Sequence, residues 1–558
     1  MSDLTKREFL AASTTALAAV LVPTLGFAQT ADPKVSSTKR ITLDDLRAAS
    51  KVAGVSFSDE QLSLILKDVQ DTIDSFPALR AQSDNGFLAP ATTFRVMGEP
   101  ETSKVSFKLA TKKVARPSSD DDLAFLSATE LSRLIHSRQL TSSELTRTYL
   151  SRLKRYGSKL RCVINLTEDL ALRQAAQADQ ELAAGRSRGP LHGLPYGLKD
   201  LFAVPGYPTT WGAEPYKTQV FEQESAVYTR LREAGGVLVA KLSMGALAEG
   251  DNWFGGRTES PWDPTLGSSG SSAGSASATA AGLLAFAIGT ETSGSIVSPS
   301  HNCRVTGLRP TFGSVSRYGA MALSWTMDKV GPICRTADDC AMVFASLIGV
   351  DHRDPSTIAR GFRYPATVDV SSLRVGVLVE DKAMKTPLKI SEVPAYSAMS
   401  KLGAKLHPMT MDAGPDGLGI ILVAEAAAAF DSLTRGPHLD DIKGTGWPNT
   451  FRESRLIPAV ELVLADRRRR QLQEHYNDVF AKWDLVVLPN QGYARVYQWN
   501  LTGHPQVLVP LGQDAKGKPI SVSLVGPLFS EGRLLALASQ IQAMTGQAKL
   551  RPDMHRWE

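Results

Sequence analysis

The chain has 558 residues, which is enough for a large core and for more than one domain. Its composition is that of an ordinary soluble globular protein, with 43% hydrophobic and 21% charged residues. The net charge of +5 is small for this length and argues against a dedicated nucleic-acid-binding protein, so we expect no nucleic acid among its partners. The basic run from Arg467 to Arg470 is interpreted as the solvated face of a helix.

Residues 1–28 resemble an export signal. Lys6 and Arg7 precede an apolar, Ala-rich run, and Gly26-Phe27-Ala28 has the small-x-Ala form of a cleavage site. The segment TKREFL at residues 5–10 is similar to a twin-arginine motif with Lys in place of the first Arg. A proline and several threonines interrupt the apolar run, so we expect cleavage rather than an uncleaved anchor. The protein is then periplasmic or secreted, by either the general secretory or the twin-arginine route.

The rest of the chain gives no sign of a membrane segment or a metal site. No later stretch reaches the roughly 18 uninterrupted apolar residues that a span needs, so we expect no stable membrane insertion after signal cleavage. Cys162, Cys303, Cys334 and Cys340 lack metal-site spacing, and we expect no metal and no cofactor. An oxidising compartment permits a disulfide between Cys334 and Cys340, but buried free thiols are favoured for all four.

Residues 29–119 are predicted to form a linker and a helical N-terminal extension. Within them, residues 41–76 are predicted to be helical, because apolar residues recur at helical spacing and Ser58 with Gln61 fits a capping box. This segment faintly resembles the small helical partner subunit of tRNA-dependent amidotransferases, and we expect it to wrap the main domain. Residues 77–120 are rich in Pro and polar residues and are predicted to be a connecting loop.

Residues 120–558 are predicted to form one catalytic domain of the α/β class. Two capping boxes, Ser127 with Glu130 and Thr141 with Glu144, start two amphipathic helices. Strand-like and helical segments then alternate, which predicts a sheet covered by helices on both faces. The predicted strands are Val163–Asn165, Val237–Lys241, Val375–Val379 and Leu485–Leu488, and the predicted helices include Glu168–Ala184, Ala226–Glu233, Ala337–Leu347 and Leu534–Met544.

The stretch from Gly267 to Ser295 is the most informative part of the sequence. It has a Ser/Gly-rich turn at each end and an apolar, small-residue middle, Ala276–Ile288, which suits a helix buried on every side. Two such turns bring hydroxyl groups together in a dry place, where they need partners. Lys199, in the apolar segment LHGLPYGLKDLF, is a candidate third group, although taken by itself a lysine in such a segment is more often a surface residue on a loop.

Taken together, three motifs resemble the amidase-signature family: GLPYGLKD at 193–200, GSSAGS at 270–275 and GTETSGSI at 289–296. The likeness runs from about residue 120 to 547 and includes SPWDP, CRVTGLRPTFGSVSRYG and DKVGPICRTADDCA. The resemblance implies a single large mixed sheet with helices on both sides. It also implies that Lys199, Ser271 and Ser295 form the catalytic triad of an amidase.

The chemistry implied by this resemblance runs through two hydroxyls. Ser295 attacks the amide carbonyl, Ser271 relays the proton, and Lys199 is the final base. Lys199 must be neutral, so its pKa must fall several units below about 10.4, which burial can achieve. Asp200 is expected to point away from Lys199, because neighbouring side chains alternate in an extended segment.

The resemblance also implies residues that support the reaction. The family has a cis peptide before the bridging serine, and Gly270 suits such a link. Ser272 is expected to support the site without touching the substrate. The backbone N–H groups of Thr292, Ser293, Gly294 and Ser295 are expected to hold the oxyanion, and losing one donor from such a hole typically costs about 10²–10³ in rate.

The sequence departs from the family pattern at four positions. Glu291 replaces an Asp, Ser293 a Gly, Val297 an Arg and Arg304 a Gly. A Ser at position 293 would be strained if that position needs a positive φ. We therefore expect activity with an altered pocket. Trp211, Trp253, Phe254 and Trp325 are candidates for an aromatic wall, and each is equally explained as core.

Other interpretations stay open at this point. One alternative is that a histidine is the base in place of Lys199. The candidates are His192, His301 and His504, and a positional role is favoured for all three. Gly270–Gly274 also matches the G-x-S-x-G nucleophile elbow, with Ser272 as nucleophile, but the residues before it do not look like a strand.

Three functions are compatible with the sequence. The first is an exported amidase acting on a small-molecule or peptide amide. The second is the A-type subunit of a glutamyl-tRNA amidotransferase, and the third is a catalytically silent binding homologue. A homodimer is also compatible with the sequence.

Overall fold

The structure is a computed structural model, and it divides the chain into two compact units, residues 1–83 and 84–558. The described residues are 40–52, 58–60, 62–63, 66–67, 70, 105–108, 113–365, 368–380, 387–411, 417–454, 457–490 and 495–558. The predicted export signal, residues 1–28, lies outside them. Among the described residues, no helix is long and apolar enough to cross a membrane.

The first unit contains helix α2 (Leu43–Val52), within the segment predicted to be helical. The helix begins with reciprocal contacts, because Thr42 N donates to Asp45 Oδ2 (2.8 Å) and Asp45 N donates to Thr42 Oγ1 (3.2 Å). Gln61, half of the predicted capping box, lies outside the described residues. That this segment wraps the main domain stays a prediction.

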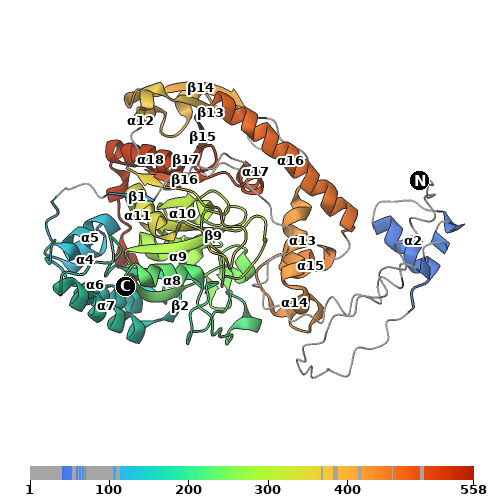
Figure 1. Ribbon diagram of the computed structural model, residues 1–558, viewed down its shortest axis with the longest axis horizontal. Helices are drawn as coiled ribbons and strands as arrows, with labels where there is room; N and C mark the ends of the chain where they lie inside the picture. The colour runs from blue at the N-terminus through green and yellow to red at the C-terminus, as the bar shows by residue number, and fades with distance from the viewer. Residues whose placement is uncertain are drawn as a thin grey trace, which may run out of the picture. The chain divides into compact units, whose positions relative to one another are not determined.

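The second unit is built on one mixed sheet of 11 strands in the order β14-β13-β15-β17-β16-β10-β11-β9-β3-β4-β2. Its strands are β2 (Val163–Leu166), β3 (Pro195–Lys199), β4 (Val237–Leu242), β9 (Phe286–Glu291), β10 (Thr306–Arg309), β11 (Lys329–Cys334), β13 (Arg374–Glu380), β14 (Lys405–Thr410), β15 (Leu485–Pro489), β16 (Gln506–Gln513) and β17 (Pro519–Val525). Strand β3 runs parallel to both neighbours, β9 and β4, whereas β11 is antiparallel to β9. The predicted α/β architecture is therefore confirmed (Figure 1).

Helices surround this sheet. They are α4 (Asp120–Ala124), α5 (Ala128–His136), α6 (Ser142–Tyr156), α7 (Glu168–Ala183), α8 (Ala226–Glu233), α9 (Ala273–Ala280), α10 (Val297–Asn302), α11 (Ala337–Leu347), α12 (Tyr396–Lys401), α13 (Gly419–Ala429), α14 (Asp431–Arg435), α15 (Trp447–Ser454), α16 (Ala459–Lys482), α17 (Arg495–Thr502) and α18 (Glu531–Thr545). Three two-stranded pieces complete the unit: β1 (Ser106–Phe107) with β12 (Arg363–Tyr364), β5 (Asn252–Trp253) with β6 (Gly256–Arg257), and β7 (Glu259–Ser260) with β8 (Asp263–Gly267).

Strand residues pack alternately into two cores. In β9, Phe286 and Ile288 join the large cluster that includes α11 and α18, whereas Ala287 joins the cluster that includes Ala278 of α9. Successive side chains of a strand point to opposite faces, so this division means that both faces of the sheet are covered. The two predicted capping boxes, at Ser127 and Thr141, are both present and start α5 and α6.

Two local predictions need correction. The stretch Ala276–Ile288 is not one buried helix, because α9 ends at Ala280, Gly282 turns the chain at φ +64° and strand β9 begins at Phe286. Small apolar residues fit a buried strand as well as a buried helix, and the pattern alone does not separate the two.

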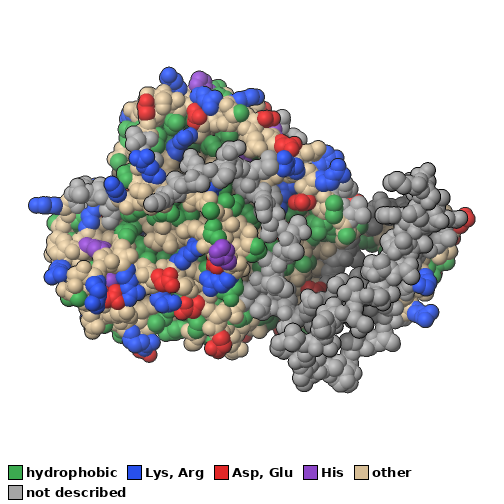
Figure 2. Space-filling model, viewed as in Figure 1, with side chains coloured by type: hydrophobic (Ala, Val, Ile, Leu, Met, Phe, Trp, Pro, Cys, Tyr) green, Lys and Arg blue, Asp and Glu red, His purple; other side chains and the backbone are tan. Residues whose placement is uncertain are grey.

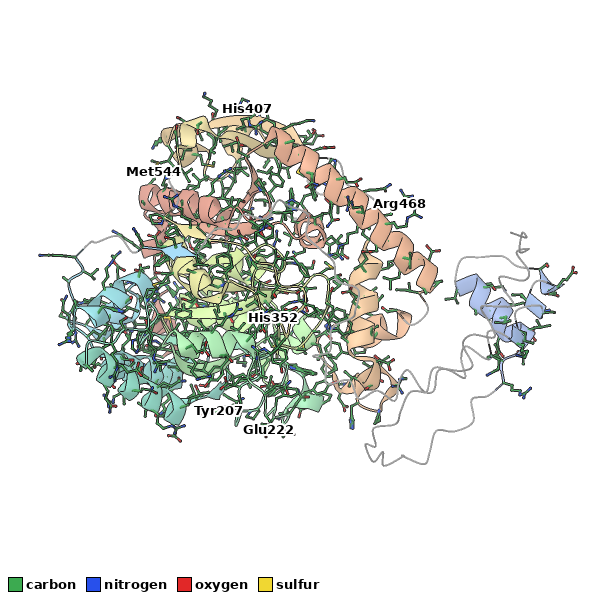
Figure 3. The ribbon with its side chains drawn as sticks, viewed as in Figure 1. Tyr207, Glu222, His352, His407, Arg468 and Met544 are labelled. Carbon is green, nitrogen blue, oxygen red and sulfur yellow. The ribbon has the colours of Figure 1, made fainter. Side chains whose placement is uncertain are left out.

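The basic run on α16 is the second correction. Arg467, Arg468 and Arg470 are exposed as predicted, and Figure 3 shows Arg468 pointing outward from the helix. Arg469, by contrast, is buried and donates to the carbonyl oxygens of Leu501 and Thr326, both at 2.6 Å. Because an α-helix has 3.6 residues per turn, four consecutive residues face all sides of α16, and Arg469 is the one that faces the protein interior. Elsewhere on the face seen in Figure 2, Lys and Arg side chains are interspersed with Asp and Glu.

The cysteines follow the favoured interpretation. All four are buried and none forms a disulfide. Burial raises the pKa of the Cys162 thiol to about 12, so this thiol stays protonated at neutral pH.

Candidate active site

Lys199 ends strand β3, in the interior of the sheet, and its side chain is fully buried. Its Nζ lies 2.7 Å from Ser271 Oγ and 2.9 Å from Thr290 Oγ1. Burial lowers the pKa of Lys199 from 10.5 to about 7, although Asp328 and Glu291 partly oppose this shift. A substantial neutral fraction is therefore present near pH 7, as a base requires.

Asp200 points away from Lys199, as alternation along β3 predicts. Its Oδ1 lies 2.8 Å from Lys241 Nζ, and its Oδ2 accepts from Thr210 N at 2.8 Å. Both side chains of this ion pair are fully buried. The carboxylate of Asp200 is thus neutralised by another lysine and does not hold a proton on Lys199.

Gly270 and Ser271 lie in the turn before α9, joined by a cis peptide bond as the resemblance implies. A Cβ at position 270 would lie 1.7 Å from the carbonyl oxygen of Gly250, so glycine is required there. Ser271 is 1% exposed, and its own carbonyl accepts from Gly245 N at 3.3 Å. These contacts hold the Ser271 hydroxyl against Lys199.

Ser272 is fully buried at the start of α9 and acts on the site through Thr290. Its Oγ donates to Thr290 O at 3.0 Å and accepts from Thr290 N at 3.2 Å. A Cβ on Gly289 would lie 2.7 Å from this hydroxyl, so Gly289 makes room for it. Ser272 therefore fixes the strand position whose side chain contacts Lys199.

The nucleophile-elbow interpretation is not supported by this geometry. The Ser272 hydroxyl is buried and engaged with backbone groups, whereas an elbow nucleophile is exposed at the end of a sheet strand. The prediction that no strand precedes Ser272 is wrong, because Asp263–Gly267 form β8. This strand pairs only with β7, outside the large sheet, so the distinction from an elbow remains.

Ser295 lies in the loop between β9 and α10 and is 8% exposed. Its carbonyl oxygen accepts from Ser272 N at 3.1 Å, which ties this loop to the turn that carries Ser271. Within the described chain, the side chains of Ser271 and Ser295 form no direct hydrogen bond. The backbone N–H groups of residues 292–295 donate to no acceptor in that same part of the protein, and their expected role in holding an oxyanion stays a prediction.

Glu291 closes the loop that carries Ser295. Its Oε2 accepts from the backbone N of Ile296 (2.8 Å) and Val297 (2.9 Å), and its Oε1 accepts from Arg309 (2.8 Å) and Asn500 (2.7 Å). Burial alone would raise the pKa of Glu291, but Arg309 and the hydrogen bonds outweigh it and lower the pKa below its usual value. From the sequence, Glu291 could be recognised only as a departure from the family pattern. Its role depends on Arg309 and Asn500, which lie later in the chain.

The other departures are also explained. Ser293 is exposed and does not have a positive φ, which falls instead on Gly294 (+98°), so the anticipated strain does not arise. Arg304 does take the left-handed conformation (φ +54°). Its guanidinium donates to Gln513 and to the Gly517 carbonyl, and it stacks over Trp262 at 4.4 Å.

Val297 is the last departure. It is buried and packs with Val496 and Leu508, so an apolar contact stands where the family has a guanidinium.

The histidines are engaged elsewhere. His192 lies 3.2 Å from Glu181, and His301 contacts Ser521 at 2.7 Å. His504 contacts Thr502 at 2.8 Å, and burial lowers its pKa to about 3. Lys199 therefore remains the candidate base.

A small cavity of about 40 Å³ is lined in part by Thr290, whose side chain contacts Lys199, and by Thr292, which lies in the loop that carries Ser295. The Thr292 hydroxyl donates to Asp328 at 2.6 Å. Of the four aromatic candidates, Trp325 lines the cavity, whereas Trp211, Trp253 and Phe254 do not. The remaining lining residues are Leu201, Ala248, Arg317, Tyr318, Ala320, Met321, Ala322, Leu323, Asp328, Lys329, Val330, Arg353, Asp354 and Pro355. Among the described residues, no cluster of side chains fits a metal ion.

Comparisons with known proteins identify the family of the chain. Residues 144–494 match the family described as Amidase. The chain is 32% identical over 480 residues to the A-type subunit of the glutamyl-tRNA(Gln) amidotransferase of Chromohalobacter salexigens, covering 76% of this chain and 97% of that protein. The corresponding protein of Pseudomonas syringae pv. tomato is 31% identical over 468 residues, covering 75% and 96%.

Solved structures give the same result. The native peptide amidase of Stenotrophomonas maltophilia is 28% identical, with a TM-score of 0.66 over 75% of this chain and 97% of that one. An amidase family protein of Bacillus anthracis shares the fold, at 24% identity and a TM-score of 0.69 over 77% and 93% of the two chains. The chain belongs to the amidase family, whose members carry the amidase signature, and it is an enzyme that hydrolyses amide C–N bonds.

Proposed function

We propose that this protein is an exported, self-sufficient amidase that converts a small-molecule or peptide amide to a carboxylate plus ammonia or an amine. The observation that carries this proposal is the contact of a fully buried Lys199 amine with the Ser271 hydroxyl at 2.7 Å. A buried lysine whose pKa lies near 7 is a base suited to neutral pH, and its partner hydroxyl is suited to pass it a proton.

In the proposed mechanism Ser295 attacks the amide carbonyl while Ser271 takes its proton and passes its own to Lys199. The tetrahedral oxyanion is held by backbone N–H groups of residues 292–295. Glu291, which precedes this loop, restrains it by accepting from the backbone N of Ile296 and Val297 at its end. The proton then returns from Lys199 through Ser271 to the leaving nitrogen. Water attacks the acyl-enzyme by the same relay and releases the carboxylate.

The second candidate is the A-type subunit of a glutamyl-tRNA amidotransferase, which the names of the relatives favour. The peptide amidase of Stenotrophomonas maltophilia and the export-like residues 1–28 favour the free-standing enzyme. The two candidates differ in what the chain needs for turnover. An amidase needs only its amide and water.

Purified protein is expected to release ammonia from members of a primary-amide panel without ATP, tRNA or other subunits. A fluorophosphonate probe should label the wild type, and Ser295→Ala should lose both labelling and turnover. Activity that appears only with added partner subunits would favour the amidotransferase candidate. A wild type that neither turns over amides nor takes the probe would favour the silent homologue.

Expression in a bacterium with both export routes tests the localisation. We expect the protein in the periplasmic fraction with its N-terminus at Gln29, because cleavage follows Ala28. Replacement of Lys6-Arg7 by two glutamines should block export. A full-length protein recovered in the cytoplasm would contradict this part of the proposal.

The rate is expected to depend on the ionisation of Lys199. Because only the neutral amine accepts a proton, kcat/KM should rise about tenfold per pH unit below pH 7 and level off above it. Lys199→Met should reduce turnover to background at every pH, with retained folding checked by circular dichroism. A wild-type profile that is flat between pH 5 and 9 would rule out this base.

Ser272→Ala separates the supporting role from the nucleophilic one. The variant loses two contacts to the Thr290 backbone, at a cost of about 1–3 kcal/mol for an unsatisfied buried group, so we expect kcat about tenfold lower and a reduced melting temperature. Fluorophosphonate labelling of Ser295 should persist. Complete loss of both labelling and turnover in a folded variant would instead identify Ser272 as the nucleophile.

A further inference from the structure

A loop formed by residues 245–251 packs against the turn that carries Ser271, although none of its side chains takes part in the mechanism. The peptide between Gly250 and Asp251 covers Gly270. A Cβ at position 270 would lie 1.7 Å from the Gly250 carbonyl oxygen and 3.2 Å from the Asp251 nitrogen. The loop therefore makes a close backbone contact with the residue that precedes Ser271.

Asp251 also holds this turn through its side chain. Its Oδ2 accepts from Ser269 N at 2.9 Å, and Ser269 has a left-handed backbone (φ +58°). A serine keeps such a conformation only where its surroundings fix it. Gly267 leaves room for the carboxylate, since a Cβ there would lie 2.2 Å from Oδ2. Asp251 thus fixes the backbone two residues before Ser271.

Glu249 fastens the same loop to helix α15. Its Oε2 accepts from Gly446 N, just before the helix, at 2.9 Å. A second contact lies beside the first, because the Trp447 indole donates to the Leu247 carbonyl at 3.0 Å. Helix α15 in turn packs against α13 and α14 (Figure 1). The loop is therefore attached to the catalytic turn on one side and to this group of helices on the other.

The backbone of the loop is itself strained. Leu247 (φ +49°) and Ala248 (φ +65°) are consecutive residues with side chains in the left-handed region. Leu247 N donates to the Trp211 carbonyl at 2.9 Å, which together with the Trp447 contact holds this conformation. Strained backbone that is over-determined by its neighbours is found mainly where a protein must hold functional groups in place.

We propose that Asp251 and Glu249 are positioning residues of the proton relay, which clamp their shared loop against the turn and so hold the Ser271 hydroxyl at Lys199. The inference rests on the proposed function, because it assumes that Ser271 passes the proton. A small displacement of the turn lengthens the 2.7 Å contact between Ser271 and Lys199 and slows proton transfer. Because both carboxylates act through the backbone, they are expected to affect kcat rather than KM.

Asp251→Ala tests the contact nearer to the relay. Turnover is measured on an amide from the primary-amide panel, and active sites are counted by fluorophosphonate titration, so that misfolded molecules do not enter kcat. We expect kcat per titrated site to fall about tenfold with KM within about twofold, because the Ser269 N–H loses its acceptor. Asp251→Asn keeps an oxygen acceptor and should stay close to the wild-type rate.

Glu249→Ala tests the attachment to α15, and we expect a smaller fall in kcat, about threefold. In the double variant the combined effect should be smaller than the product of the two single effects, since both residues hold one loop. The matched control is Asp179→Ala. Asp179 is also half-buried and accepts from backbone N–H groups of another segment, those of Ser142 (2.6 Å) and Ser143 (3.0 Å). It should lower the melting temperature without changing kcat per titrated site.

Hydrogen exchange of residues 268–272 measures the clamp without any substrate. Exchange should be faster in Asp251→Ala and Glu249→Ala than in the wild type, and unchanged in Asp179→Ala. An unchanged kcat per titrated site in Asp251→Ala, or unchanged exchange of this segment, would overturn the inference. Failure of the proposed function looks different, because the wild type would then turn over no amide, and exchange alone would decide whether the loop clamps the turn.

Discussion

The site depends on one costly feature, an amine buried without a carboxylate partner of its own. Lys199 is fully enclosed, and the carboxylate next to it in sequence is paired with Lys241 instead. Burial disfavours the charged form of an amine, and only a nearby opposite charge offsets this cost. The Lys199 amine therefore both accepts and releases a proton easily. Two hydroxyls, from Ser271 and Thr290, satisfy the amine without recharging it.

Close backbone packing makes this burial possible. Gly270 fits under the Gly250 carbonyl, and Gly289 admits the Ser272 hydroxyl to the surface of the sheet. Ser272 then sets the position of Thr290, and Glu291 in the next position closes the loop that presents Ser295. Lys199 and the groups around it are thus positioned by neighbouring strands, which are more rigid than loops. A lysine on a surface loop would stay hydrated and charged.

Much of this could be predicted from the sequence, because it is local. Capping boxes at Ser127 and Thr141 and the alternation of strands and helices each depend on neighbours in the chain. The contact of Lys199 with Ser271, 72 residues along the chain, follows only from the family resemblance. The length of α9 could not, since its small apolar residues suit a buried strand equally well and the sheet decides.

Contacts between segments that are distant in the chain also could not be predicted from the sequence. Glu291 meets Arg309 and Asn500, and the inward turn of Arg469 depends on the Leu501 and Thr326 carbonyls. The roles of Ser271 and Ser295 remain predictions that rest on the family motifs and on this geometry.

The ionisation of the Lys199 amine is the central claim, and it can be measured without any substrate. Protein labelled with ¹⁵N at lysine side chains, titrated by NMR with Lys199→Met for assignment, would report the pKa of this amine directly. The account predicts a midpoint near 7. A midpoint near the ordinary value of about 10.4 would contradict it, because such a lysine would be charged at neutral pH and would have no free electron pair for the proton of Ser271.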